Sequence, residues 1–355
     1  MSEFVPQQSD RFLNSVVNTF LAPGERVEEI KLVSSGFSGA TIARVTTNLA
    51  DYALRGWPQD SLPAERIREL HAYLNHLNNL GLPVAVPVRV NSGETLVLHI
   101  GQFWQCEPWL PGIPATFGDC SPENVQSIMQ TLASLHLASE RFLSQTSGQR
   151  WFSSGVDVVP AVIERAQLIQ SWQSASTGQT TLQYQGLSKV AREICVEILS
   201  RFHESSTEIL HELKSLSSLK LAVFPCWRDM HREHILLTNR RVTGIIDASA
   251  TRTDHPATDL SRFLGSLWGD DFERWELALD QYRQHRSLTS NDLKVLIALD
   301  RSSVLLSGLT WVERWCRAEV AESREKEVLE RMHTIASRMK RLHAPENRER
   351  YSAWN

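Results

Sequence analysis

Two aspartates, Asp229 and Asp247, stand on either side of a segment that has the pattern of a β-hairpin. Two apolar runs, 235–237 and 242–246, flank the polar turn 238–241, and short aliphatic or β-branched runs around such a turn are typical of a hairpin. A carboxylate just before the hairpin and another at its far end would meet at the same edge. Hard cations prefer oxygen ligands, so the pattern predicts two acids that hold a metal–phosphate complex.

A loop of small residues near the N-terminus is a second candidate. Residues 34–39 (SSGFSG) separate two strand-like segments, 27–33 and 40–46. Glycine and serine allow the backbone N–H groups of such a loop to approach phosphates closely. Taken alone, the loop is better explained as an ordinary Gly-Ser turn, because short glycine motifs often match by chance. The nearby pattern His231-Arg232-Glu233-His234 is not HExxH, which excludes the zinc-protease motif.

The elements that would position these residues fall into two groups. The first 106 residues predict about five strands, at 27–33, 40–46, 52–55, 84–90 and 95–105, with a helix at 63–80. A turn at 91–94 makes the last two strands a hairpin. Beyond the Pro- and Gly-rich segment 107–112 the chain is mostly helical, and 187–219 predicts one long helix or two with a break near 205–206. A length of 355 residues also favours two lobes over one core.

Composition excludes several classes of function. The formal charge is −4 and no long basic run occurs, so a nucleic-acid partner has no electrostatic support. No segment approaches the ~20 apolar residues of a membrane helix, and the N-terminus lacks a signal-peptide pattern. The five cysteines form no CxxC pair, which predicts reduced thiols rather than zinc or disulfides. We therefore expect a soluble cytoplasmic protein without membrane or nucleic-acid partners.

Four motifs, in this order and spacing, resemble those of the aminoglycoside phosphotransferase/choline kinase family. Residues 132–136 (LASLH) fit its L-A-x-L-H helix, and residues 227–236 (WRDMHREHIL) occupy the frame of its catalytic loop, H-G-D-x-H-x-x-N-x-L. Residues 244–247 (GIID) are similar to its G-x-I-D segment, and residues 254–260 (DHPATDL) to its G-D-P-x-x-D-L stretch. The resemblance implies an α+β, protein-kinase-like fold with a β-rich N-lobe (1–106), a hinge (107–112) and a larger, mostly helical C-lobe (113–355).

The resemblance also implies roles for individual residues. By position, Asp229 matches the base that accepts the proton of the acceptor hydroxyl, and Asp247 matches the acid that holds Mg²⁺ against the nucleotide phosphates. Phosphoryl transfer needs such a pair because catalysis is mainly positioning and neutralisation of charge. Arg55 stands where the family has a Lys or Arg that reaches the phosphates. Glu69 is its expected helix partner, with Glu65 as the alternative.

The remaining nucleotide contacts follow the same frame. Gly36, Ser38 and Gly39 would cover the phosphates, and Glu107 to Trp109 would offer backbone groups to the adenine. The cofactors implied are ATP, or another nucleoside triphosphate, and Mg²⁺, with Mn²⁺ as an alternative. The activity implied is phosphorylation of a hydroxyl on a small molecule.

Two departures from the family pattern leave alternatives open. His234 stands where the family has an Asn metal ligand, and imidazole suits softer divalent ions better than Mg²⁺. Trp227 replaces the His that normally braces the catalytic loop, although core packing explains a Trp there. The departures allow a catalytically impaired pseudokinase as an alternative, and nucleotidyl transfer as a weaker one. Asp270, Asp271 and Glu313, with nearby tryptophans, raise the further alternative of a cationic acceptor.

Overall fold

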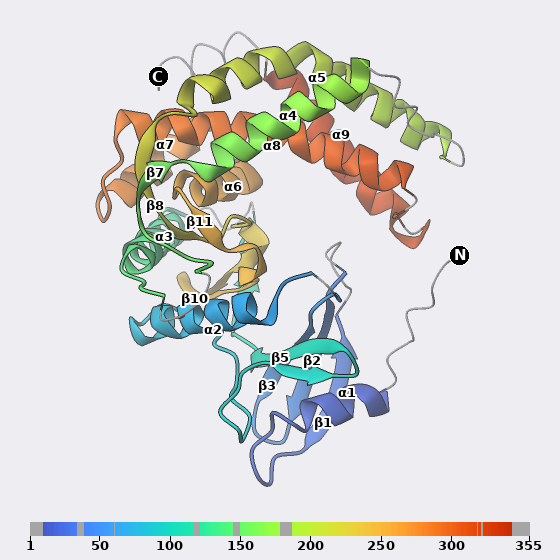
Figure 1. The fold of residues 1–355 in the computed structure, drawn as a ribbon, viewed down its shortest axis with the longest axis vertical. Helices are drawn as coiled ribbons and strands as arrows, with labels where there is room; N and C mark the ends of the chain where they lie inside the picture. Colours follow the sequence, from blue (N-terminus) through green and yellow to red (C-terminus); the bar gives the residue numbers. More distant parts are fainter. Residues whose placement is uncertain are drawn as a thin grey trace. The chain divides into compact units, whose positions relative to one another are not determined.

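The chain folds into two compact units, each described by itself here. The computed structural model describes residues 10–33, 39–59, 61–116, 121–144, 150–177, 187–317, 319–320 and 322–342. Unit 1 comprises Met1–Ala115, Arg141–Ser153 and Glu233–Ser249, and unit 2 comprises Thr116–Glu140, Ser154–Arg232 and Ala250–Asn355 (Figure 1). Unit 1 carries a five-stranded antiparallel sheet and unit 2 is mostly helical, which confirms the predicted α+β, protein-kinase-like fold class.

The sheet of unit 1 has the strand order β1-β2-β3-β5-β4. Its strands are β1 (Val27–Leu32), β2 (Thr41–Thr47), β3 (Asp51–Gly56), β4 (Val97–His99) and β5 (Gln102–Pro108). The number of strands agrees with the sequence prediction, but the predicted strand at 84–90 is wrong. Pro87 lies in the middle of that segment and cannot donate a ladder hydrogen bond. The hairpin instead joins β4 to β5 through Ile100 and Gly101, both with positive φ.

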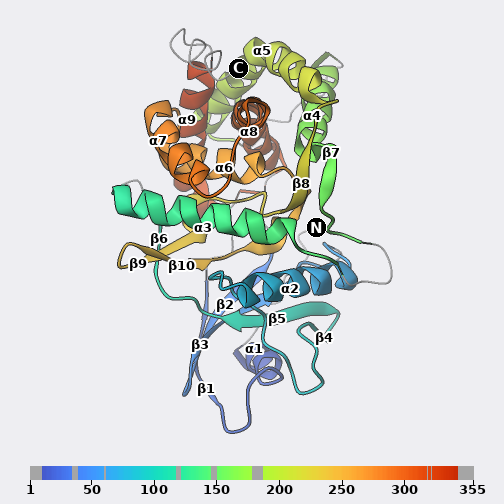
Figure 2. The same cartoon turned by 90° about the vertical axis from the view of Figure 1, so that its left-hand side faces the viewer.

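Two helices support this sheet. Helix α1 (Asp10–Val17) buries Leu13, Val16 and Val17 in a core that also contains Trp104 of β5. Helix α2 (Ala64–Asn79) runs beside β5 (Figure 2) and is joined to it by His71 Nε2, which lies 3.0 Å from Gln105 Oε1. Gly81 follows α2 with φ +82°, the left-handed conformation that commonly ends a helix. The contact between His71 and Gln105 holds α2 against the face of the sheet that carries Gln105.

The predicted hairpin after the catalytic-loop motif is confirmed. Strands β9 (Ile235–Thr238) and β10 (Arg241–Ile245) are antiparallel, and β9 also pairs with the short strand β6 (Ile113–Pro114). Asn239 and Arg240 connect the two strands, both with positive φ, as two-residue hairpin turns of this class require. Residues 233–249 belong to unit 1, so Asp247 lies in that unit and Asp229 in unit 2.

Unit 2 is built around one long helix. Helix α8 (Ser290–Cys316) contacts α4 (Pro160–Thr177), α5 (Lys189–Leu216), α6 (Ala257–Trp268) and α9 (Glu325–Arg341), and Figure 2 views it nearly end-on among them. Helix α5 runs unbroken through Ser205 and Ser206, both buried, so the predicted single helix is correct and the break is not. Helices α3 (Pro122–Glu140) and α7 (Phe272–Arg283), with the sheet β11-β8-β7, complete the unit.

Helix α8 is also apolar enough to raise the question of a membrane. Within the described part of the chain it is the one helix whose length and composition would allow a crossing. However, 78% of its apolar window is buried inside the fold, so it packs as a core helix.

The strands of the small sheet in unit 2 are β7 (Gly155–Val158), β8 (Lys220–Cys226) and β11 (Arg252–Asp254). Strand β8 leads directly into the catalytic-loop motif.

Candidate active site

In unit 1 the proposed metal-binding acid is paired with the proposed phosphate-binding cation. Arg55 Nη2 donates to Asp247 Oδ1 at 2.7 Å, and Ser249 Oγ donates to the same oxygen at 2.8 Å. The guanidinium of Arg55 also lies over the Trp57 ring, 5.4 Å from its centroid. Burial raises the pKa of Asp247, but Arg55 and the nearby polar groups outweigh it and the net shift is downward. The carboxylate is thus held in its charged form.

The backbone of Asp247 is itself unusual. Its φ is +57°, in the left-handed region, which few residues other than glycine adopt and in which asparagine and aspartate are the commonest exceptions. Arg228 has φ +63°. Such conformations are costly and are concentrated at functional sites, where the surrounding structure holds them. The family pattern has a glycine at the position of Arg228, and this backbone geometry gives a physical reason for that glycine.

His234 lies close to Asp247. Its Nε2 is 3.9 Å from Asp247 Oδ2, so the two residues proposed as metal ligands are neighbours in unit 1. Among the described residues no group of three or more His, Cys, Asp or Glu side chains is arranged to hold a metal ion. Mg²⁺ is usually bound by one or two carboxylates together with phosphate oxygens and water. A two-residue ligand set of one carboxylate and one imidazole therefore fits a cation that a nucleotide brings with it.

Glu107 points to the same face of the sheet as Arg55. In the β3–β5 ladder Arg55 pairs with Gln105 and Ala53 pairs with Glu107, so Arg55 and Glu107 are diagonal neighbours. Gln105 Nε2 donates to Glu107 Oε2 at 2.9 Å. Burial raises the pKa of Glu107 and the Asp247 charge adds to that effect, while Arg55 opposes it. The side chain of Glu107 is thus part of the polar cluster around Arg55, which the sequence did not predict.

Glu69 and the loop residues Gly36, Ser38 and Gly39 are the other residues predicted to contact the nucleotide or its arginine. Glu69 accepts a hydrogen bond from the Trp151 N–H at 2.8 Å, whereas Arg55 pairs with Asp247, so the helix partnership expected for Glu69 is not the one this structure records. Its other oxygen is buried without a hydrogen-bond partner among the described residues. Gly39 has φ +72°, and Gly36 and Ser38 lie outside the described residues.

Trp109, which lies in the predicted hinge, is hydrogen-bonded to the sheet through its backbone. The Trp109 N–H donates to the Asp51 carbonyl at 2.9 Å, so this backbone donor is not available to an adenine ring. The indole is 37% exposed, and the Arg44 guanidinium lies 4.8 Å from its centroid. Trp109 therefore offers an exposed aromatic face rather than a free backbone donor.

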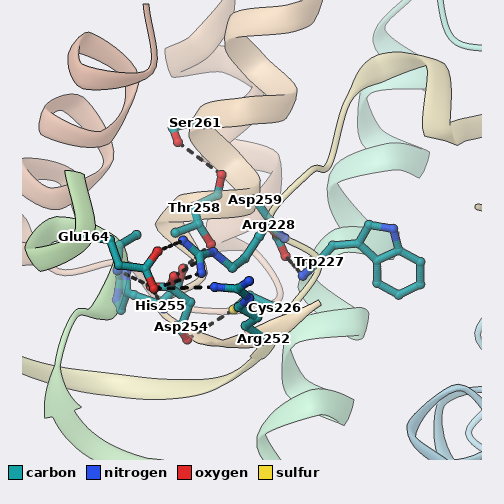
Figure 3. Close-up of polar contacts among 11 residues, drawn as sticks. Glu164, Cys226, Trp227, Arg228, Arg252, Asp254, His255, Thr258, Asp259 and Ser261 are labelled. Atoms are coloured by element: carbon teal, nitrogen blue, oxygen red, sulfur yellow. Dashed lines mark hydrogen bonds and ion pairs between the residues drawn. The ribbon is translucent and has the colours of Figure 1, made fainter. Parts of the chain in front are cut away.

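In unit 2 one buried carboxylate anchors the backbone at the start of the catalytic-loop motif. Asp259 Oδ2 accepts the Trp227 N–H at 2.9 Å, and Asp259 Oδ1 accepts the Arg228 N–H at 2.6 Å. Figure 3 shows the Trp227 indole pointing away from the polar side chains, and the residue is 1% exposed. Trp227 is therefore a core residue whose backbone, not its side chain, is part of the loop anchor.

A buried histidine from the predicted L-A-x-L-H helix supports the same anchor. His136 Nε2 lies 3.2 Å from Asp259 Oδ2, and His136 Nδ1 lies 2.7 Å from the Tyr282 hydroxyl. Burial lowers the pKa of His136 more than Asp259 raises it, which favours the neutral ring. A neutral His136 would donate from Nε2 to the carboxylate and accept from the tyrosine. Helices α3, α6 and α7 are thereby joined beneath the catalytic loop.

The Arg228 side chain makes a second anchor (Figure 3). Its guanidinium binds Glu164 of α4 at 2.5 Å and Asp254 of β11 at 3.1 Å. Asp254 is fully buried, and burial raises its pKa although Arg228 opposes the shift. The loop is therefore fixed through its backbone by one acid and through this arginine by two more. The spacing of the family motif does not reveal these partners.

Asp229, the proposed base, is half-exposed and faces an arginine. Arg262 Nε of α6 lies 2.9 Å from Asp229 Oδ1, and the side chains are 35% and 43% exposed. The sequence reasoning missed Arg262. The signal was present, because Asp259, Arg262 and Ser266 have the spacing i, i+3, i+7 of one helix face.

The acids considered for a cationic acceptor are all occupied. Asp270 binds Arg338 and Arg341, at 2.8 and 2.6 Å. Asp271 caps α7 by accepting the N–H of Arg274, and Glu313 pairs with Arg317. Two arginines, Arg314 and Arg331, lie over the Trp311 ring. These contacts give the cationic-acceptor alternative no support.

A separate cavity of about 630 Å³ lies in unit 2, near the end of α5 and the start of α8. It is lined by Glu212, Ser215, Leu216, Ser218, Leu219, Lys220, Asn291 and Lys294. None of the predicted site residues is among them. This cavity is therefore unrelated to the proposed chemistry.

Comparison with known proteins identifies the family and the fold of the chain. Residues 29–295 match the family model described as "Phosphotransferase enzyme family". A search of curated proteins found no match. Among solved structures the chain is similar to an amicoumacin kinase in complex with AMP-PNP, Ca²⁺ and Ami (TM-score 0.64, 13% identity, covering 95% of this chain and 96% of that one).

Two further structures have the same fold. An aminoglycoside phosphotransferase from Alicyclobacillus acidocaldarius has a TM-score of 0.63 at 17% identity, covering 99% of this chain and 98% of that one. A microcompartment-associated aminopropanol kinase has a TM-score of 0.63 at 13% identity, covering 96% and 100%. At these identities the likeness concerns the fold, whereas the family match spans most of the chain. The chain belongs to the phosphotransferase enzyme family, and the resemblance read from its four motifs is confirmed.

Proposed function

We propose that this protein is an ATP-dependent phosphotransferase that transfers the γ-phosphoryl group to a hydroxyl of a small molecule. The observation that carries the proposal is the Arg55–Asp247 pair, held beside His234 and built on a strained backbone at Asp247. A cation for phosphate and an acid for the metal are the two groups that phosphoryl transfer requires. The nucleotide, ATP or a related triphosphate, has a counterpart in the AMP-PNP of one structural neighbour.

Each residue has a defined part in the proposed reaction. Asp229 accepts the proton as the acceptor oxygen forms its bond to the γ-phosphorus. The bond from that phosphorus to the bridging oxygen breaks, and the nucleoside diphosphate leaves. Arg55 exchanges its Asp247 contact for phosphate oxygens, which an arginine binds as a fixed fork. Asp247 and His234 would hold Mg²⁺, or Mn²⁺, and the metal supplies neutralisation of phosphate charge.

The substitution at His234 supports an altered metal preference. Imidazole nitrogen is a poor ligand for Mg²⁺ and a better one for Mn²⁺. The test is a thermal-shift screen of nucleotides crossed with Mg²⁺ and Mn²⁺. We expect stabilisation by ATP with metal, greater with Mn²⁺, and loss of the metal-dependent part in Asp247→Asn. In His234→Asn the order of the two metals should reverse toward Mg²⁺. No nucleotide shift with either metal in the wild-type protein would refute the proposal.

A pseudokinase that binds nucleotide without transferring phosphate is the second candidate. Its motivation is the replacement of the family His by Trp227 and of the family Asn by His234. The replacement of the His by Trp227 is the weaker of the two arguments, because Asp259 and Arg228 hold the loop without a histidine side chain at this position. The pseudokinase predicts metal-independent nucleotide binding and no phosphate release. Nucleotidyl transfer would instead add an adenylyl mass to the product.

Several finer points belong to the same proposal. The acceptor is a small molecule with a hydroxyl group, and the engaged acids on unit 2 argue against a cation-binding pocket there. The division into N-lobe (1–106), hinge (107–112) and C-lobe (113–355) and the cytoplasmic location stay predictions from the sequence. Glu107, a diagonal neighbour of Arg55, is proposed to hold that arginine once Asp247 binds metal, and Glu69 stays the helix partner expected from the family pattern. Gly36, Ser38 and Gly39 are proposed to cover the phosphates, and Trp109 to contact the base through its ring.

A further inference from the structure

One face of α6 holds the catalytic loop at three successive points. Asp259 accepts the backbone N–H groups at the start of the loop, as described above. Arg262, one turn further, binds the side chain of Asp229, and Ser266 Oγ accepts the Arg232 N–H at 2.9 Å. The spacing i, i+3, i+7 places all three on one stripe of the helix. Asp259 and Ser266 bind backbone N–H groups of the loop, whereas Arg262 binds the side chain of the proposed base.

Arg262 uses only part of its hydrogen-bonding capacity. An arginine has five N–H donors, and Arg262 places only Nε on Asp229. Its two Nη groups have no hydrogen-bond partner among the described residues, and the side chain is 35% exposed. Two less exposed arginines of the same unit differ, since Arg228 binds two carboxylates and Arg338 binds Asp270 and Asp300. Within the described part of the chain, Arg262 therefore presents four N–H donors without a partner beside the proposed base.

The chemistry of these donors matches a tetrahedral or planar oxyanion. A guanidinium binds phosphate or carboxylate oxygens in a bidentate manner, and such charge-assisted bonds are stronger than neutral ones. A half-exposed ion pair such as Arg262–Asp229 is weak, so it does not prevent the arginine from turning toward a second anion. We propose that Arg262 is an anion-binding residue next to Asp229. Its Nη groups bind oxygens of the phosphoryl group in transfer, or of an anionic substituent on the acceptor. This inference rests on the proposed function.

The first experiment measures inorganic phosphate binding to the full chain, without nucleotide or metal, by titration calorimetry. The wild-type protein should bind phosphate, and Arg262→Ala should weaken that binding about ten-fold or more, the loss of roughly one charge-assisted hydrogen bond or two. Arg262→Lys should give an intermediate value, because it keeps the charge without the fork. Arg274→Ala removes a similarly exposed arginine that pairs with Asp271 and should bind phosphate as the wild type does. Equal affinity in Arg262→Ala and the wild type, or no phosphate binding at all, overturns the inference.

A second experiment separates the two sources of the anion. If Arg262 binds the phosphoryl group in transfer, Arg262→Ala should lower kcat for ATP hydrolysis about ten-fold or more with little change in the KM for ATP. If it binds the acceptor, hydrolysis should be unchanged, and the wild type should bind D-glycerate better than glycerol, a preference lost in Arg262→Ala. No effect in either assay contradicts the inference. Because the phosphate titration needs no nucleotide, it stays informative even if the nucleotide screen refutes the proposed function.

Discussion

At the residue scale, the catalytic loop depends on buried charges that the motif does not display. Arg228 has a strained φ and its side chain is shared by Glu164 and Asp254. Asp254 is fully buried, so its charge needs that arginine. The sequence identified the acids expected to do chemistry, Asp229 and Asp247, from their positions around the hairpin. It could not identify their partners, because ion pairs across α4, β11 and α6 depend on tertiary packing rather than on spacing.

Replacing Arg228 by alanine should therefore destabilise unit 2. We expect a loss of about 3 kcal/mol in the free energy of unfolding, the usual cost of leaving a buried charge without its partner. The double variant Arg228→Ala/Asp254→Asn should lose less than the single one, since the uncompensated charge is gone. Urea unfolding at neutral pH measures both. Arg252→Ala is the control, because Arg252 lies 3.9 Å from the same Glu164 but is 58% exposed. A loss in Arg228→Ala no greater than in Arg252→Ala would contradict this account.

At the element scale, periodicity predicted helices α2 and α5 and the first three strands, whereas a proline explains the strand that was predicted wrongly. The segment 84–90 alternates like a strand, yet Pro87 prevents a continuous ladder, and the true hairpin turns at Ile100 and Gly101. Helix α5 stays unbroken at Ser205 and Ser206 because both serines are buried within the helical unit, which no local signal reveals. The role of helix α6 in holding the predicted catalytic loop became apparent only from the contacts along one stripe of that helix.

A cluster of charged side chains lies where α6, α8 and α9 pack together. Asp300 of α8 is 1% exposed and binds Arg338 of α9, and Arg338 also binds Asp270 at the end of α6. Burial raises the pKa of Asp300 from its ordinary value of 3.8 to about 6, against the opposing effect of Arg338. The folded protein thus holds this proton more tightly than the unfolded chain does. Stability from this group falls as the pH rises from about 4 through about 6.

Asp300→Asn should remove that pH dependence. The wild-type stability minus the variant stability should decrease between pH 4.5 and pH 7, by at most about 3 kcal/mol, which is the value of a shift of roughly two pKa units. Urea unfolding at several pH values measures the difference. Asp280→Asn, at an exposed Asp280–Arg283 pair, should follow the wild-type profile. The assignment is wrong if the wild-type and Asp300→Asn profiles run parallel over this range.

At the scale of the whole molecule, the residues proposed for the chemistry are divided between the two units. Unit 1 supplies Arg55, His234 and Asp247, and unit 2 supplies Asp229 with its anchors in Asp259 and Arg262. The division of the chain into a β-rich and a helical part followed from length and periodicity. Length and periodicity did not predict that residues 233–249 belong to the unit that carries the sheet. The hairpin is joined to that unit by β6 and by the contact between Val84 and Ile245.

The most direct test of the central claim is phosphate release from ATP, measured with Mg²⁺ and with Mn²⁺ for the wild-type protein and for Asp229→Ala. Asp229 is half-exposed at the surface of unit 2, so alanine there should leave the fold intact, which circular dichroism can verify. If the protein is a phosphotransferase with Asp229 as its base, the wild type releases phosphate slowly, with water as acceptor, and the variant loses at least about 100-fold of that rate. No release by the wild type with either metal, or equal release by the variant, would contradict the account.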